Sequence, residues 1–288
     1  MTVVLITVAT HDYGYLQVLK ESCNRHGFEL IVLGWGATYT GHLMKTELTI
    51  PFLENCDPRQ IVMFVDGFDS LIMRNADDVE RIFVEMNVPF IFSADMKLTH
   101  DMYLDEFIGK ITGVVNRVVC NSSPDAGMLN SGLFIGYAAS LLRVLRESVE
   151  MSQKLPDIKS NQRMLQEVCK TNPFPIDTNR HLFYNRNFKF LRKEKFINGE
   201  FWVKNNGAYT QPCVISAPAG GSLDDILKQL NYSTKIYEAK HSILYLLKTT
   251  TFNYKRLWFV CILAVVVCIF KKHIFAPNPT PRRKLLQR

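Results

Sequence analysis

The chain has 288 residues, of which 47% are hydrophobic and 21% charged, a composition that predicts a folded protein with a substantial core rather than a disordered one. Its formal charge of +7 is local, because residues 241–288 hold nine Lys or Arg and no acid, leaving 25 basic and 27 acidic side chains before them. This distribution argues against nucleic-acid binding by the first 240 residues. The seven cysteines are scattered and form no CxxC pair, which indicates reduced thiols rather than a disulfide framework or a zinc site.

Apolar, β-favouring runs alternate with helical patterns along the first 140 residues. The predicted strands are 3–9, 29–33, 61–65, 89–93 and 132–137, and the predicted helices are 15–26, 44–55, 76–86 and 139–153. Such alternation predicts parallel βαβ units in a three-layer α/β sandwich. Farther along we expect a helix over 161–170, a loop-dominated segment with one hairpin over 171–206, and a strand over 213–216.

The segment IVMFVDGFDS, residues 61–70, is the most informative in the chain. Five apolar residues predict a buried strand, after which Gly67 separates Asp66 from Asp69. Open α/β sheets bind ligands at the carboxyl ends of their strands, and two carboxylates there can share a hard cation that holds a diphosphate. The alternative is an ordinary polar turn in which Asp69 caps the following helix.

The C-terminal run LWFVCILAVVVCIF, residues 257–270, is apolar throughout and has two basic residues on each side. Fourteen residues are short for a span, since about 20 cross a typical hydrocarbon core, so a buried core helix is the alternative. The basic flanks and the proline-containing basic tail favour a membrane anchor. We therefore expect a domain over 1–240, a juxtamembrane helix or linker over 241–256, an anchor over 257–270 and a basic tail over 271–288.

The orientation of that anchor follows from two conflicting signals. The positive-inside rule would keep the basic tail in the cytosol, whereas the lack of a basic, signal-peptide-like N-terminus would keep the body there. A single span cannot satisfy both. We expect a cytosolic body attached to a membrane, with an interfacial or hairpin anchor as the alternative.

Several common motifs do not occur in the sequence. It contains no GxGxxG, no GxxxxGK[ST], no GxSxG and no HExxH, so neither a dinucleotide fingerprint, a P-loop, a nucleophile elbow nor a zincin helix is present. A βαβ sheet with paired carboxylates at a strand end suits a nucleotide diphosphate held through a metal.

An ordered set of motifs carries a family resemblance. These are ITVAT (6–10), GYL (14–16), LGWG (33–36), FVDGFD (64–69), FSAD (92–95), LNSGLFIGY (129–137) and QLNY (229–232). Together they resemble the glycosyltransferase domain of the multifunctional procollagen lysyl hydroxylases, over nearly all of the first 235 residues. The resemblance implies a GT-A fold, with a Rossmann-like, mostly parallel sheet flanked by helices, that uses UDP-sugars and Mn²⁺.

The resemblance also implies roles for individual residues. Asp66 and Asp69 match the family's metal-binding aspartates, which would hold Mn²⁺ against the donor's phosphates. Thr7, Val8 and Ala9 match the strand end beside the uracil; their alternative is plain sheet core.

Three further positions are assigned to the donor or the acceptor in the same way. Lys45 is expected to reach a phosphate or the base, with a solvated surface lysine as the alternative. Asn130, Ser131 and Gly132 form an expected turn at the donor sugar, which would otherwise only lead into a strand. Asp95 stands where the family usually has Glu and would bind a sugar hydroxyl or assist the acceptor, unless it merely ends a strand.

The sequence departs from the family pattern in two places. The family completes its metal site with a histidine after the last core strand, where this chain has Ser216 followed by APAGGS. The missing ligand could be replaced by Ser216, Asp224, Asp225 or water. Lys228 could supply a phosphate contact. The family's acidic run before a glutamine is reduced here, leaving Asn161 and Gln162 as the catalytic candidates.

The sequence thus predicts a membrane-anchored hexosyltransferase that uses Mn²⁺ and UDP-glucose or UDP-galactose, with an acceptor hydroxyl on a glycan or protein and no nucleic-acid partner. The alternative is a degenerate GT-A domain that binds a nucleotide-sugar or a protein at a membrane.

Overall fold

The computed structural model describes residues 2–95, 128–156, 158, 160–186, 194–205, 207–218 and 221–232. The chain divides into two units, Met1–Ala239 and Lys240–Arg288, and every described residue belongs to the first. The expected segments 241–256, 257–270 and 271–288 therefore lie outside the described residues, and with them the expected C-terminal hydrophobic helix. Within the described ranges, no helix is both long enough and apolar enough to cross a membrane.

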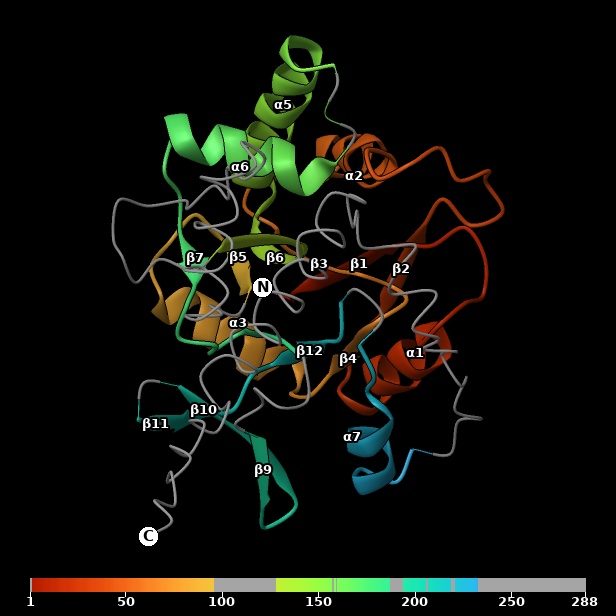
Figure 1. Ribbon diagram of the computed structural model, residues 1–288, viewed down its shortest axis with the longest axis vertical. Coiled ribbons are helices and arrows are strands. Elements are labelled where there is room, and N and C mark those ends of the chain that lie inside the picture. The colour runs from red at the N-terminus through yellow and green to blue at the C-terminus, as the bar shows by residue number, and fades with distance from the viewer. Residues whose placement is uncertain are drawn as a thin grey trace, which may run out of the picture. The chain divides into compact units, whose positions relative to one another are not determined.

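A six-stranded sheet forms the middle layer of the first unit (Figure 1), in the order β2-β1-β3-β6-β5-β7. Its strands are β1 (Val4–Val8), β2 (Leu30–Leu33), β3 (Ile61–Val65), β5 (Phe90–Asp95), β6 (Met128–Tyr137) and β7 (Ile176–Asp177). Five of the six include segments that the sequence predicts as strands, and β3 has the predicted bounds. The short β7 falls in the segment predicted to be mostly loop.

The central sheet is mostly parallel, as the resemblance implies, and β6 is the one described strand of this sheet that runs in the opposite direction. Strand β1 runs parallel to β2 and β3, and β5 runs parallel to β7, but β6 is antiparallel to both of its neighbours. Val65 at the end of β3 pairs with Leu133, and Asp95 at the end of β5 pairs with Met128. The sheet is therefore mixed, and the first half of β6 lies at the edge where β1, β3 and β5 end.

Helices cover both faces of this sheet, as Figure 1 shows. On one face lie α2 (Met44–Glu54), α5 (Ala138–Lys154) and α6 (Asn161–Thr171), and on the other α1 (Leu16–Arg25) and α3 (Ala76–Glu85). The residues of β3 alternate between the two cores: Met63 packs with the α1 and α3 residues, whereas Phe64 packs with those of α2, α5 and α6. This alternation is the two-residue period of a strand that is buried on both faces.

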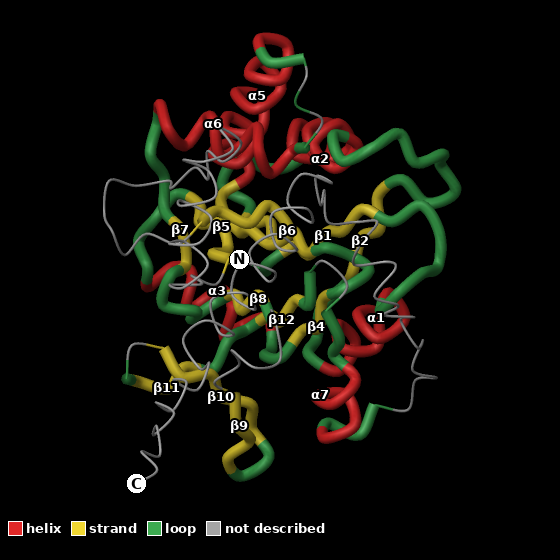
Figure 2. Tube along the Cα trace, in the orientation of Figure 1, coloured by secondary structure: helices red, strands yellow, loops and turns green. Residues whose placement is uncertain are grey.

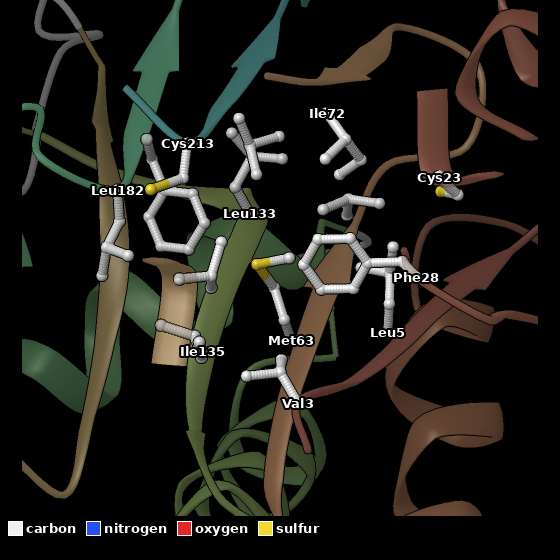
Figure 3. Close-up of a cluster of buried hydrophobic side chains, with 14 of the residues drawn as sticks. Val3, Leu5, Cys23, Phe28, Met63, Ile72, Leu133, Ile135, Leu182 and Cys213 are labelled. Atoms are coloured by element: carbon white, nitrogen blue, oxygen red, sulfur yellow. The ribbon is translucent and has the colours of Figure 1, made fainter. Parts of the chain in front are cut away.

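Figure 3 shows the core on the α1 and α3 side, in which Met63 from β3 lies among Leu5, Leu133 and Ile135 from neighbouring strands. Cys23 and Cys213 also belong to this core, and burial raises the pKa of each thiol to about 12. The four described cysteines are free, in agreement with the reduced thiols expected from the sequence.

A small second sheet packs beside the central one (Figure 2), in the order β4-β12-β8. It joins three distant segments: β4 (Ser70–Ile72), β12 (Val214–Ser216) and β8 (Phe183–Asn185). Strand β12 is antiparallel to β4 and parallel to β8. The sequence predicted β12 but neither β4 nor β8.

The expected hairpin lies in a third sheet, formed by β9 (Glu194–Ile197), β10 (Glu200–Asn205) and β11 (Ala208–Thr210). Asn198 and Gly199 connect β9 to β10, and both have positive φ angles, of 51° and 84°. A two-residue Asn-Gly loop with this geometry is the preferred connection of a tight hairpin. The last described helix is α7 (Asp224–Gln229).

Candidate active site

The carboxyl edge of the central sheet brings together residues of β1, β3 and β6. Thr7 of β1 is fully buried, and its Oγ1 donates a hydrogen bond of 2.7 Å to the carbonyl oxygen of Val65 at the end of β3. The next peptide N–H, that of Asp66, donates to the carbonyl oxygen of Gly132 in β6 at 2.8 Å. Asp66 is therefore held between β1 and β6, in the position that the sequence predicts.

The turn from Asp66 to Asp69 is packed tightly against its neighbours. A Cβ atom at Gly67 would lie 2.9 Å from Oγ1 of Thr7, which explains why glycine stands there. The peptide N–H of Tyr15, at the start of α1, donates to the carbonyl oxygen of Phe68 at 2.9 Å. The turn is thus fixed from β1 on one side and from α1 on the other.

Asp69 directly precedes β4 and not a helix. The next helix, α3, begins later and is capped by Asn75, whose side chain accepts a hydrogen bond from the N–H of Asp78. The interpretation of Asp69 as a helix cap is therefore wrong. Ser216 Oγ donates to Oδ1 of Asp69 at 3.1 Å, and the N–H of Ala217 donates to the Asp69 carbonyl oxygen at 2.8 Å.

The pKa of Asp69 is raised to about 7, first by burial and then by the neighbouring carboxylate of Asp66, whereas Lys45 and hydrogen bonds from Ser216 and Ser70 oppose the shift. Burial and the nearby negative charge both disfavour the ionised form of the Asp69 carboxyl group.

Asp66 has two close neighbours besides the sheet. Lys45, the second residue of α2, forms an ion pair with Asp66 Oδ1, and the two side chains are 25% and 23% exposed. On the other side, a Cβ atom at Gly132 would lie only 2.7 Å from Asp66 Oδ2. Gly132 therefore provides the space in which the Asp66 carboxylate sits.

These oxygen atoms suit a hard divalent cation. Two carboxylates at a strand end, one of them with a raised pKa, and the Ser216 hydroxyl form an oxygen donor set of the kind that Mg²⁺ or Mn²⁺ prefers. Within the described residues, no group of three or more His, Cys, Asp or Glu side chains could hold a metal.

The two acids considered as replacements for the family's histidine bind elsewhere. Asp224 accepts a hydrogen bond of 2.6 Å from the hydroxyl of Tyr15, and Asp225 pairs with Arg186. Burial, followed by the bond to Asp224, raises the pKa of Tyr15 to about 12. Of the proposed substitutes, Ser216 contacts an aspartate of the pair, Asp69.

The LNSG segment corrects another expectation, because it is the irregular first half of β6 rather than a turn before it. The pairing register between β5 and β6 shifts at Phe92 and Ser93, so that Phe92 faces Phe134 whereas Ser93 faces Asn130. The extra residues of β6 let Oδ1 of Asn130 accept from the N–H of Gly132 at 2.7 Å. A bulge of this kind re-aims the backbone next to the carboxylates.

The start of α6 lies against this bulge. Ser131 Oγ donates to Oδ1 of Asn161 at 3.3 Å, and the Ser131 N–H donates to Oε1 of Gln162 at 3.4 Å. Ser160 caps the helix, its hydroxyl accepting from the N–H of Arg163. The two catalytic candidates, Asn161 and Gln162, are therefore beside the LNSG segment, and their catalytic role stays a prediction.

The other predicted site residues are placed on β1, on β5, on α7 and directly after β1. Val8 is half-buried in β1, and Ala9 is buried, with its N–H bonded to the carbonyl oxygen of Leu33 at 3.1 Å. Asp95 is the last residue of β5, opposite Met128. Lys228 lies exposed on α7, and no contact among the described residues joins it to Asp66 or Asp69.

Sequence reasoning missed Arg186, whose side chain is only 1% exposed. Its guanidinium binds both carboxylate oxygens of Glu194, both of Asp225 and the carbonyl oxygen of Ser222, while its peptide N–H donates to the carbonyl oxygen of Ser216. These partners hold its pKa above the usual range in spite of burial. Arg186 thus fixes the segment that follows Ser216, and a lone arginine in an aromatic, Asn-rich segment gives no sequence signal of this role.

Two more features were not predicted. His11, Tyr13 and Phe68 form an aromatic cluster with ring centroids 5.5–5.8 Å apart, and Tyr13 is more than half exposed. The position of Phe68 between the two aspartates was the signal that could have found it. Asn185 donates to Ser93 Oγ and to the Ala94 carbonyl oxygen, but its buried Oδ1 has no donor among the described residues.

Known proteins show similarity to this chain. The procollagen-lysine,2-oxoglutarate 5-dioxygenase of Drosophila melanogaster is 27% identical over an alignment of 158 residues that covers 51% of this chain and 20% of that protein. The crystal structure of the galactosyltransferase LgtC with donor and acceptor sugar analogues aligns with 62% of this chain and 74% of that chain, at 13% identity and a TM-score of 0.41. The family model described as the PLOD GT domain matches residues 1–243. The chain therefore belongs to the PLOD GT domain family.

Proposed function

We propose that the protein is a metal-dependent glycosyltransferase of the GT-A type, which transfers glucose or galactose from a UDP-sugar to an acceptor hydroxyl. The observation that carries this proposal is the pair Asp66 and Asp69, placed at the carboxyl end of a central strand and completed by the Ser216 hydroxyl. The family assignment supports the transferase class. The name of the matched Drosophila protein does not identify the acceptor of this chain.

The carboxylates Asp66 and Asp69 would hold Mn²⁺, which when bound neutralises the charge that develops on the departing UDP. Gly132 and the bulge in β6 let the donor approach the backbone closely, and the amide and hydroxyl groups of Asn130, Ser131 and Asn161 could orient sugar hydroxyls. The exposed ring of Tyr13, in contact with Phe68, provides a face on which a base could stack.

The test is a UDP-release assay on the full chain with UDP-glucose and UDP-galactose, with Mn²⁺ or with a chelator. We expect Mn²⁺-dependent release that Asp66→Asn and Asp69→Asn each reduce by at least about a hundredfold. Asp77→Asn, an acid in the first turn of α3, is the matched control and should retain wild-type release. Wild-type turnover in either site variant would exclude the assignment.

A second candidate is a binding domain without transferase activity. Two observations favour it: among the described residues no third acidic, histidine or cysteine ligand joins Asp66 and Asp69, and the family's acidic run is reduced to Asn161 and Gln162. Calorimetry that detects binding of UDP with Mn²⁺, together with no UDP release from either sugar nucleotide, would select this candidate.

A further inference from the structure

The Lys45 ammonium occupies the position on Asp66 at which a cation would bind. It pairs with Oδ1 of Asp66, and its charge also acts on Asp69. The backbone of Lys45 is anchored within α2, where its carbonyl oxygen accepts a hydrogen bond of 2.6 Å from Thr49 Oγ1. The flexible four-carbon side chain can therefore move while its Cα atom stays in place.

The same carboxylate oxygen cannot serve two cations at full strength. A divalent ion between Asp66 and Asp69 would lie beside the Lys45 ammonium, and the two positive charges would repel each other in a half-buried setting where screening by water is weak. The Lys45 side chain must leave Asp66 when the ion binds, and it then needs another anionic partner.

We propose that Lys45 is a displaceable cation that neutralises Asp66 in the free protein and passes to the diphosphate of the donor, so that the divalent ion and the nucleotide bind as one unit. This inference rests on the proposed function, because it assumes that the site takes a metal and a nucleotide diphosphate. Each ligand removes an obstacle for the other: the ion releases Lys45, and the diphosphate gives it a new partner. Such mutual dependence is a coupling free energy between two binding events and must be reciprocal.

Calorimetry on the full chain can measure this coupling directly. The titrations are Mn²⁺ alone, UDP alone and UDP at saturating Mn²⁺, and a Mn²⁺ electron paramagnetic resonance titration checks the first. The variants are Lys45→Met, which keeps the length without the charge, Lys45→Arg, which keeps the charge, and Lys170→Met, a control that removes a lysine paired with Glu167 on α6.

The expected effects of Lys45→Met have opposite signs. Mn²⁺ alone should bind about tenfold more tightly, because the competing ammonium is gone, whereas UDP at saturating Mn²⁺ should bind about tenfold more weakly. Lys45→Arg should keep the weak binding of Mn²⁺ alone, and Lys170→Met should match the wild type in every titration. A purely structural role of Lys45 would change both affinities in the same direction.

Three results would overturn the inference. If Lys45→Met leaves Mn²⁺ binding unchanged or weakens it, Lys45 does not compete for the cation position. If it strengthens Mn²⁺ binding but leaves UDP binding unchanged, the ammonium does not pass to the diphosphate. In both cases wild-type binding of UDP with Mn²⁺ preserves the proposed function, whereas a wild-type chain that binds neither ligand overturns both proposals.

Discussion

Ser216 and Asp69 are joined by a hydrogen bond of 3.1 Å although they lie 147 positions apart in the chain. The bond connects the last residue of β12 to the residue that precedes β4, and the two strands themselves form an antiparallel pair. Ser216 therefore contacts Asp69 at the strand end where the resemblance leads us to expect a histidine.

Replacing Ser216 by histidine is expected to strengthen cation binding. In Ser216→His an imidazole would stand beside Asp69 and could supply the nitrogen ligand that the described residues lack, so the Kd of Mn²⁺ at saturating UDP should fall by about tenfold. Calorimetry measures it. Ser216→Ala removes the hydrogen bond to Asp69 without adding a ligand and should not gain affinity; equal gains in both variants would contradict the explanation.

Adding a methyl group at Gly132 should weaken the cation site. In Gly132→Ala the Cβ atom would lie 2.7 Å from Asp66 Oδ2 and 2.9 Å from Asn130 Oδ1, so the carboxylate must shift. We expect a loss of about 1–2 kcal/mol in the binding of UDP with Mn²⁺, roughly five- to thirtyfold in Kd.

Gly136, in the same strand but away from the aspartates, provides the control. A Cβ atom there would collide with Phe90, so Gly136→Ala should lower the melting temperature while the folded protein keeps its affinity. Equal losses of affinity in the two variants would show that Gly132 acts through the stability of β6 alone.

Removing the Arg186 guanidinium should destabilise the fold strongly. Arg186→Met leaves the carboxylates of Glu194 and Asp225 without their buried partner, and breaking such a pair typically costs about 3–5 kcal/mol. Urea denaturation gives the free energy of unfolding. The exposed pair between Arg146 and Glu54 is the control, since Arg146→Met should cost no more than about 1 kcal/mol; similar losses would rule out a special role for Arg186.

We propose that residues 257–270 attach the chain to a membrane, and a charge in the middle of this run tests the proposal. An arginine at a helix centre costs about 2.5–3.5 kcal/mol for insertion, so Val266→Arg should sharply reduce flotation with neutral phosphatidylcholine vesicles. Gln287→Arg adds the same charge outside the run and should float like the wild type. Equal flotation of all three chains would contradict an anchor at this position.

Local patterns were sufficient to predict much of the fold. Strand β3 was predicted because five consecutive apolar residues end at Asp66, and α1, α2, α3, α5 and α6 lie within two residues of their predicted bounds. Strands β4 and β8, of three residues each, were not predicted. Their existence depends on β12, which pairs with both from a distant part of the chain.

The sequence indicated which residues form the candidate site, but not which of them contact one another. The motif FVDGFD indicated both aspartates, but the ion pair between Lys45 and Asp66 depends on how α2 packs on the sheet, which no local pattern contains. The antiparallel direction of β6 is likewise a property of pairing, and it determines that Gly132 rather than Tyr137 lies beside Asp66.

The turn from Asp66 to Asp69 connects two different sheets. Asp66 is bonded through its N–H to β6 in the central sheet, whereas Asp69 is bonded through its carbonyl oxygen to Ala217, next to the small sheet. A small rotation of one sheet against the other would change the separation of the two carboxylates. Because Mg²⁺, Mn²⁺ and Ca²⁺ differ in radius and in the ligand geometry that they accept, the choice among them would depend on the packing between the sheets as well as on the ligands themselves.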